Sequence, residues 1–315
     1  MKIVFFGNAD FGLKTLIRIL DSSSHQVIGV VTNSDKKIGR NKQKRSTPIK
    51  KIAIERKINL IEQDNLSDID FTKKIKSLNA DIFLVIAYKI MPKSLYSLPK
   101  YGSVNLHASL LPQYRGAAPI QRAIIDNLSK TGLSTFFINE FVDKGKIILQ
   151  KEVEILSNDT FEDLWKRLAE KGGDVVLKTL ELVELNKREV GRKKQNLKGS
   201  YAPKIKKEEL LIDWKEPAER IYNKIRAFSP YPCMYTHYNK KRVKIVNSDL
   251  KDQKANKNQI PGTILTEEGK LFVKCGDFFI QILALAPESK KKMSASEFIN
   301  GFIKKSNSKY ANEFR

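Results

Sequence analysis

Short apolar runs alternate with amphipathic stretches through the first half of the chain. Runs bounded by Gly, Asn and Asp predict strands at residues 2–6, 26–31, 59–61, 81–86 and 103–106. Apolar residues at helical spacing predict helices between them, at residues 11–20, 48–57 and 70–78. Strands that alternate with helices are typical of βαβ units. We therefore expect an α/β domain with a mostly parallel sheet that is covered on both faces.

A long helix and a set of short strands follow. Apolar residues at helical spacing run from Phe161 to Val183, and we expect Asn158 and Asp159 to cap this helix. The segment after Asn186 is basic and poor in apolar residues, which is typical of a linker. Short strands are then predicted at residues 235–238, 242–246, 262–265, 271–274 and 278–285. Such a series favours a small antiparallel barrel of the OB type.

The composition indicates a globular protein with room for two domains. The chain has 315 residues, of which 41% are hydrophobic and 30% are charged. Its longest apolar stretch, Ile82 to Tyr88, is far shorter than the roughly 20 residues that a membrane helix needs. Cys233 and Cys275 are far apart and predict neither a disulfide framework nor a zinc site. We therefore expect a cytoplasmic protein that does not enter a membrane.

The net charge of +23 is large and clustered. Residues 36–51 hold eight basic residues and no acidic one, and residues 187–207 hold nine basic residues against the single Glu189. Charge of this size attracts polyanions, and its clustering favours a nucleic-acid partner. Isolated lysines such as Lys73 and Lys76 are interpreted as ordinary solvated surface.

Asn105 and His107 form a candidate catalytic pair. They are two residues apart at the end of a predicted strand, so their side chains project to the same face. Ligands of parallel sheets bind beyond the carboxyl ends of the strands, which is where this pair is expected. An amide and an imidazole that reach one developing oxyanion suit acyl transfer. A lone histidine is more often structural, but its position here favours catalysis.

Longer motifs give the chain a specific resemblance. Ser-Leu-Leu-Pro begins at Ser109, Arg-Gly-Ala-Ala-Pro at Arg115, and Tyr-Ala-Pro-Lys at Tyr201. Phe-Ser-Pro-Tyr-Pro begins at Phe228 and Met-Ser-Ala at Met293, so the likeness covers nearly the whole chain. In these motifs the chain resembles the methionyl-tRNA formyltransferases, which formylate initiator methionyl-tRNA with 10-formyltetrahydrofolate.

The resemblance implies a fold, partners and a domain plan. It implies a Rossmann-like formyltransferase domain at residues 1–186, a basic linker at 187–207, and a C-terminal OB-like tRNA-binding domain at 208–315. It also implies 10-formyltetrahydrofolate as co-substrate, initiator methionyl-tRNA as acceptor, a monomer, and no metal.

The resemblance also implies roles for individual residues. The catalytic trio is Asn105, His107 and Asp143. We expect Asn105 and a protonated His107 to donate hydrogen bonds to the oxyanion, and Asp143 to favour the imidazolium. The implied folate-binding residues are Ser109, Leu110, Leu111, Pro112, Ala87 and Tyr88. The implied tRNA-binding residues are Arg40, Lys42, Lys204, Lys206 and Lys207.

Two loops depart from the family pattern, and two other functions remain open. Residues 88–90 lack a glycine that the family usually has, and Lys144, Lys146 and Phe141 replace family residues around Asp143. One alternative is formyl transfer to a small amine, such as glycinamide ribonucleotide or an amino sugar, although the basic segments are not needed for that. The other alternative is a non-catalytic RNA-binding protein on the same scaffold, against which the intact trio argues.

Overall fold

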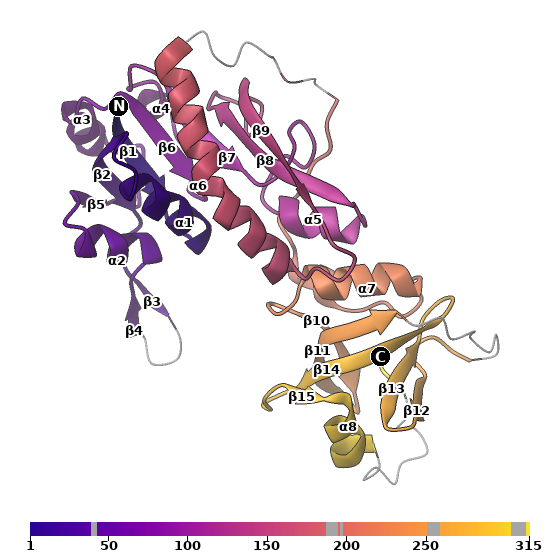
Figure 1. Ribbon diagram of the computed structural model, residues 1–315. Helices are drawn as coiled ribbons and strands as arrows, with labels where there is room; N and C mark the ends of the chain where they lie inside the picture. Colours follow the sequence, from indigo (N-terminus) through magenta and orange to yellow (C-terminus); the bar gives the residue numbers. More distant parts are fainter. Residues whose placement is uncertain (39–42, 187–194, 196–197, 251–258, 304–312) are drawn as a thin grey trace. The chain divides into compact units, whose positions relative to one another are not determined.

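The computed structural model describes residues 1–38, 43–186, 195, 198–250, 259–303 and 313–315 (Figure 1). The chain divides into two compact units. The first comprises Met1–Pro119, Lys130–Glu154 and Trp165–Pro203, and the second comprises Ile120–Ser129, Ile155–Leu164 and Lys204–Arg315. Among the described residues, no helix combines the length and the apolar character needed to cross a membrane.

The first unit is built on a seven-stranded sheet. Its strands are β1 (Lys2–Gly7), β2 (Gln26–Thr32), β5 (Leu60–Glu62), β6 (Ile82–Ile86), β7 (Ser103–His107), β8 (Lys130–Phe137) and β9 (Ile147–Glu154). The order is β5-β2-β1-β6-β7-β8-β9. The first five strands are parallel, and β8 and β9 are antiparallel additions beside β7. The predicted mostly parallel sheet is confirmed.

The β8–β9 hairpin was absent from the sequence prediction. Inside β8, Thr131, Ser134 and Thr135 are fully or almost fully buried, so polar residues occupy positions that usually carry an apolar signal. The Thr135 hydroxyl is hydrogen-bonded at 2.8 Å to the hydroxyl of Thr179 in the long helix that follows, which satisfies one of these buried groups. The strand is therefore buried without being apolar, and its pattern does not identify it.

Helices cover both faces of this sheet (Figure 1). On one face α3 (Ile69–Ser77) and α4 (Lys93–Tyr96) pack on a core that includes Phe6 and Phe83. On the other face lie α1 (Asp10–Leu20), α2 (Pro48–Glu55) and α6 (Phe161–Asn186). The strand period of two sends neighbouring residues to opposite faces, so β1 supplies apolar side chains to both layers. A short hairpin, β3 (Lys36–Ile38) and β4 (Gln43–Arg45), lies between β2 and α2 in the chain.

The helix starts follow local chemistry. Thr47 caps α2 by accepting a hydrogen bond from the Lys50 amide at 3.0 Å, with Pro48 in the first turn as predicted. The predicted cap of α6 was wrong by one residue. Thr160 and Asp163 bond reciprocally at the start of α6, while Asp159 accepts from the Leu156 amide in the preceding turn.

The second unit contains an antiparallel sheet and short helices. Its strands are β10 (Met234–Tyr238), β11 (Lys241–Leu250), β12 (Ile264–Glu267), β13 (Lys270–Lys274), β14 (Phe279–Pro287) and β15 (Met293–Ser294). The main order is β10-β11-β14-β13-β12, with β15 paired to β14. The helical elements are α5 (Pro119–Ile125), η2 (Lys207–Leu210), α7 (Ala218–Ala227), α8 (Ala295–Phe298) and η3 (Ile299–Ile303). All five strands predicted here are confirmed, and the helices were not predicted.

Residues Glu313–Arg315 close this sheet into a barrel. The Phe314 amide donates to the carbonyl of Gly262 beside β12, at 2.8 Å. On the opposite edge, His237 of β10 and Arg315 exchange two backbone hydrogen bonds, at 2.7 and 2.9 Å. The Phe314 ring is buried and stacks on Trp214, with the ring centroids 5.9 Å apart. The prediction of a barrel-like C-terminal domain is therefore confirmed.

Replacing Phe314 tests this closure. Phe314→Ala removes a buried aromatic side chain and is expected to lower the free energy of unfolding of the second unit by about 3–5 kcal/mol. The measurement is a urea titration followed by Trp214 fluorescence in a Trp165→Phe background. Phe278→Ala, at a phenylalanine that is 49% exposed, is the matched control and should cost far less. Equal effects of the two substitutions would contradict closure by the Phe314 segment.

Candidate active site

Strand β7 carries Asn105 and His107 at the centre of the first sheet. Asn105 pairs with Val85 on one side and with Phe136 on the other, and His107 is the last residue of the strand. Their spacing of two places both side chains on one face, as predicted. The Asn105 side chain is half-buried, and among the described residues it has no hydrogen-bond partner. Its amide is therefore available to a substrate.

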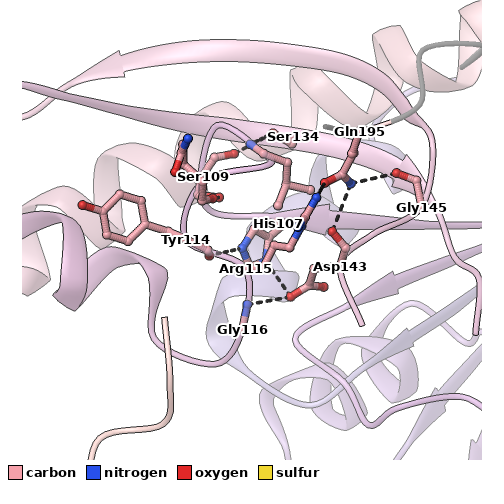
Figure 2. Close-up of polar contacts among 11 residues, drawn as sticks. His107, Ser109, Tyr114, Arg115, Gly116, Ser134, Asp143, Gly145 and Gln195 are labelled. Carbon is pink, nitrogen blue, oxygen red and sulfur yellow. Dashed lines mark hydrogen bonds and ion pairs between the residues drawn. The ribbon is translucent and has the colours of Figure 1, made fainter. Parts of the chain in front are cut away.

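A backbone carbonyl orients the His107 ring. Nε2 of the imidazole lies 2.8 Å from the carbonyl oxygen of Tyr114 (Figure 2). A carbonyl only accepts hydrogen bonds, so Nε2 carries a proton and Nδ1 is the basic atom of the neutral ring. In the neutral ring this contact occupies the one N–H group. Any proton exchange at neutral His107 therefore falls to Nδ1.

Asp143 faces this free nitrogen. Its Oδ2 lies 3.8 Å from Nδ1 of His107, which is too long for a hydrogen bond but short enough for strong electrostatic interaction. The same oxygen accepts a hydrogen bond from the Gly116 amide at 2.8 Å. Asp143 has a φ of +54°, in the left-handed region that aspartate tolerates better than most residues. The structure thus brings together His107, from the end of β7, and Asp143, from the loop between β8 and β9.

The loop after β7 is held by the Tyr-Ala-Pro-Lys segment. The Tyr114 amide donates to the hydroxyl of Ser200 at 2.8 Å, and the Ala202 amide donates to the Arg115 carbonyl at 2.6 Å. Gly116 has a φ of +117°, and a Cβ added there would lie 2.6 Å from the carbonyl oxygen of Ala202. Only glycine fits this position, because both the conformation and the close backbone approach exclude a side chain.

Gln195 links this loop to the Asp143 loop. Its Oε1 accepts from the Arg115 guanidinium, at 3.1 Å from Nε and 2.7 Å from Nη2. Its Nε2 donates to the carbonyl oxygens of Asp143 and Gly145, at 3.0 and 2.7 Å (Figure 2). The sequence reasoning missed Gln195, since one glutamine in a basic segment matches no motif.

The Ser109–Pro112 loop is tied to β8. The Ser109 hydroxyl donates to the Gln113 carbonyl at 2.6 Å, and the Ser109 carbonyl accepts from the Ser134 hydroxyl at 2.6 Å. The Leu111 amide donates to the same Ser134 hydroxyl at 3.0 Å. Ser109 and Leu111 are buried, and Leu110 is half-buried. The loop that the sequence assigned to folate therefore has a fixed conformation.

Ala87 and Tyr88 follow the end of β6, next to β7. Ala87 is exposed and has a φ of +49°. The Tyr88 ring lies against Phe6, with ring centroids 5.8 Å apart, and its hydroxyl donates to the Gln63 carbonyl at 3.3 Å. Burial raises the pKa of this hydroxyl, so it stays protonated at neutral pH. The partly buried side chain of Tyr88 packs against the core.

The residues expected to bind tRNA are only partly described. Lys204, Lys206 and Lys207 are exposed in the second unit, where Lys207 begins η2. Arg40 and Lys42 lie outside the described residues.

Comparison with known proteins identifies the class. The sequence profile of the formyl transferase family matches residues 1–180, and that of the formyl transferase C-terminal domain matches residues 204–303. The chain is therefore a formyl-transferring enzyme. A methionyl-tRNA formyltransferase from Thermodesulfovibrio yellowstonii is 39% identical over 300 residues, which is 95% of each chain. The chain belongs to the methionyl-tRNA formyltransferase family, as its motifs predicted.

Solved structures share the fold. An N-formyltransferase from Helicobacter canadensis, in complex with folinic acid and dTDP-3-aminofucose, is 22% identical and has a TM-score of 0.63. The match covers 93% of this chain and 100% of that one. A methionyl-tRNA formyltransferase from Clostridium thermocellum is 19% identical, with a TM-score of 0.56 over 81% of this chain and 95% of that one. At these identities the likeness concerns the fold alone.

A methyl group at Gly116 should disrupt the site. Gly116→Ala places Cβ against the Ala202 carbonyl and displaces the amide that binds Asp143, so stability and formyl transfer should both fall. Gly102→Ala is the control in the same unit, because φ is +83° but the nearest atom to an added Cβ is 3.4 Å away. We expect Gly116→Ala to cost at least about 1–2 kcal/mol more in urea unfolding. Equal costs would contradict the close packing of Gly116 against residues 199–202.

Proposed function

We propose that this enzyme transfers the formyl group of 10-formyltetrahydrofolate to the α-amine of initiator methionyl-tRNA. The choice of acceptor is supported by the identity to methionyl-tRNA formyltransferases over nearly the full chain. The chemistry rests on one observation, which is the placement of Asn105 and the His107–Asp143 pair at the carboxyl end of β7. In this proposal the tRNA is the polyanionic partner of the basic segments at residues 36–51 and 187–207.

The surroundings of the pair suit a folate donor. In our proposal the Ser109–Pro112 loop and the backbone around Ala87 contact the pterin. Ile90, Phe141 and Val142 are 79%, 55% and 47% exposed, on the loop after β6 and on the loop that carries Asp143. Exposed apolar side chains on loops beside a polar site are suited to a flat heteroaromatic ring. These two loops are the ones that depart from the family pattern.

The reaction needs a neutral amine and a stabilised oxyanion. A free α-amine has a pKa of about 7.7–8.0, so a useful fraction is unprotonated near neutral pH. Its nitrogen forms a bond to the formyl carbon, and the carbonyl oxygen becomes an oxyanion to which the Asn105 amide donates a hydrogen bond. The bond from the formyl carbon to N10 of the folate then breaks. The proton that the amine loses passes to N10.

His107 transfers this proton, and Asp143 stabilises the protonated ring. The Tyr114 carbonyl holds Nε2–H of His107, so Nδ1 is the atom able to accept the amine proton. The carboxylate of Asp143, 3.8 Å away, stabilises the resulting imidazolium. The ring then returns the proton towards the leaving nitrogen as a general acid. The pair therefore acts as a proton shuttle, while Asn105 stabilises the oxyanion.

Substitution of the pair tests these roles. His107→Ala and Asp143→Asn should each lower the single-turnover rate of formyl transfer by at least about 100-fold, since each removes the shuttle or its counter-charge. Affinity for tRNA should stay within about twofold in a filter-binding assay. Asp70→Asn, at an exposed aspartate of α3, is the control and should behave as the wild type.

The acceptor is tested in the same assay. Transfer to methionyl-tRNA, with none to glycinamide ribonucleotide or to an amino sugar, supports the proposed substrate. Near-normal rates in either catalytic variant would contradict the assigned roles, and transfer only to small amines would contradict the acceptor.

The second unit offers a surface for the tRNA. Tyr235 of β10 lies opposite Lys244 of β11, and the Arg242 guanidinium lies 3.6 Å from the centroid of the Tyr235 ring. Tyr231 is 77% exposed, with the Lys244 ammonium 5.8 Å from its ring centroid. Cations beside aromatic rings suit a nucleic acid, because the cations neutralise phosphates and the rings stack on unpaired bases. We call Tyr231, Tyr235, Arg242 and Lys244 the aromatic–basic face.

Loss of the arginine should change the salt dependence of binding. Arg242→Ala should weaken tRNA binding and reduce the slope of log K against log salt by about 1, since one phosphate contact is lost. Tyr235→Ala should weaken binding without changing the slope. Lys76→Ala removes one exposed cation from α3 and is the charge-matched control. If Arg242→Ala and Lys76→Ala have the same slope and affinity, the aromatic–basic face does not bind tRNA.

A further inference from the structure

Gln195 makes four hydrogen bonds within the active site. We infer that Gln195 is a positioning residue, which holds Asp143 against His107 by fixing the backbone of the Asp143 loop. The inference deepens the proposed function, on whose catalytic pair it rests. Gln195 reaches no reacting atom, and it acts through Asp143.

The amide of Gln195 is fully used. A glutamine amide offers one oxygen that accepts and one nitrogen with two hydrogens to donate. The oxygen accepts both bonds from Arg115, and the two hydrogens go to the carbonyl oxygens of Asp143 and Gly145. Arg115 is only 5% exposed, so its guanidinium needs such acceptors. A carboxamide can bind a buried cation and two carbonyls at once.

The Asp143 loop depends on this support. Phe141 and Val142 are exposed, so apolar burial contributes little to its conformation. Asp143 itself has a positive φ of +54°, which a non-glycine residue adopts only when its surroundings fix it. The two bonds from Gln195 hold the carbonyls on either side of Lys144. With this turn fixed, the carboxylate points at the Gly116 amide and at His107.

The segment that contains Gln195 also supports the other partner of His107. It belongs to the basic segment 187–207, which the sequence suggests contacts tRNA. The same segment supplies Ser200 and Ala202, which bind the loop that carries Tyr114 and Gly116. Both partners of His107, the Tyr114 carbonyl and Asp143, are thus held by this one segment.

Two substitutions separate the contacts of Gln195. Gln195→Ala removes all four hydrogen bonds. Gln195→Glu keeps an acceptor for Arg115 but has no hydrogens for the carbonyls of Asp143 and Gly145. Both variants should lower the single-turnover rate of formyl transfer at saturating enzyme by at least about tenfold, with the tRNA dissociation constant within about twofold. Gln26→Ala, at an exposed glutamine of β2, is the matched control.

Two further readouts distinguish positioning from general stability. Deuterium uptake should rise in peptides that cover residues 113–118 and 139–147 of Gln195→Ala, and stay unchanged in peptides of α3. Adding Gln195→Ala to Asp143→Asn should cost no more than about twofold, because the two substitutions remove the same function.

Several outcomes would overturn the inference. They are an unchanged single-turnover rate, a wild-type rate in Gln195→Glu, a loss confined to tRNA affinity, or unchanged deuterium uptake at residues 139–147. Failure of the proposed function is distinguishable from failure of this inference. If the wild-type enzyme formylates no methionyl-tRNA, the difference in deuterium uptake between Gln195→Ala and the wild type still tests whether Gln195 fixes the Asp143 loop.

Discussion

The proposed active site depends on the backbone pairing of residues 115–118 with residues 200–202. This pairing fixes the path of the loop after β7, and with it the Tyr114 carbonyl and the Gly116 amide. One of these groups orients the His107 ring, and the other binds the Asp143 carboxylate. The sheet supplies the position of Asn105 and His107, but a segment that follows α6 supports the groups that orient His107 and Asp143. A proposed catalytic pair with one member on a strand and the other on a loop requires such support.

Much of the fold could be predicted because its elements obey simple periodicities. The parallel strands β1, β2 and β6 carry apolar runs, and Thr47-Pro48 marks a helix start. The β8 strand could not be predicted, since its buried Ser and Thr side chains break the apolar pattern. Their hydroxyls are satisfied by Thr179 of α6 and by the Ser109 carbonyl. At the site, Asn105 and His107 follow from strand geometry. Asp143 followed only from the resemblance, and Gln195 has no local signature because its role exists only in three dimensions.

The two units serve different physical demands. The first unit must hold a few polar groups at fixed separations, so its site is supported by short hydrogen bonds between loops. The second unit presents exposed aromatic and basic side chains on a rigid barrel, in which buried Phe314 and Trp214 hold the closing segment. Electrostatic attraction to phosphates tolerates small displacements, whereas proton transfer does not. This difference fits the proposed function, in which catalysis depends on a few contacts in the first unit. Affinity for tRNA is instead spread over many exposed charges.

Main-chain atoms hold the proposed catalytic pair, and this affects which substitutions the site tolerates. The Tyr114 carbonyl, the Gly116 amide, and the carbonyls of Asp143 and Gly145 are present whatever side chains stand at most of these positions. Side chains of the Asp143 loop can therefore drift in sequence without loss of the proton path, provided the backbone keeps its course. The unusual lysines and phenylalanine around Asp143 are an instance of that freedom. Substitutions can therefore change the side chains that face a ligand while the proposed proton chemistry stays constant.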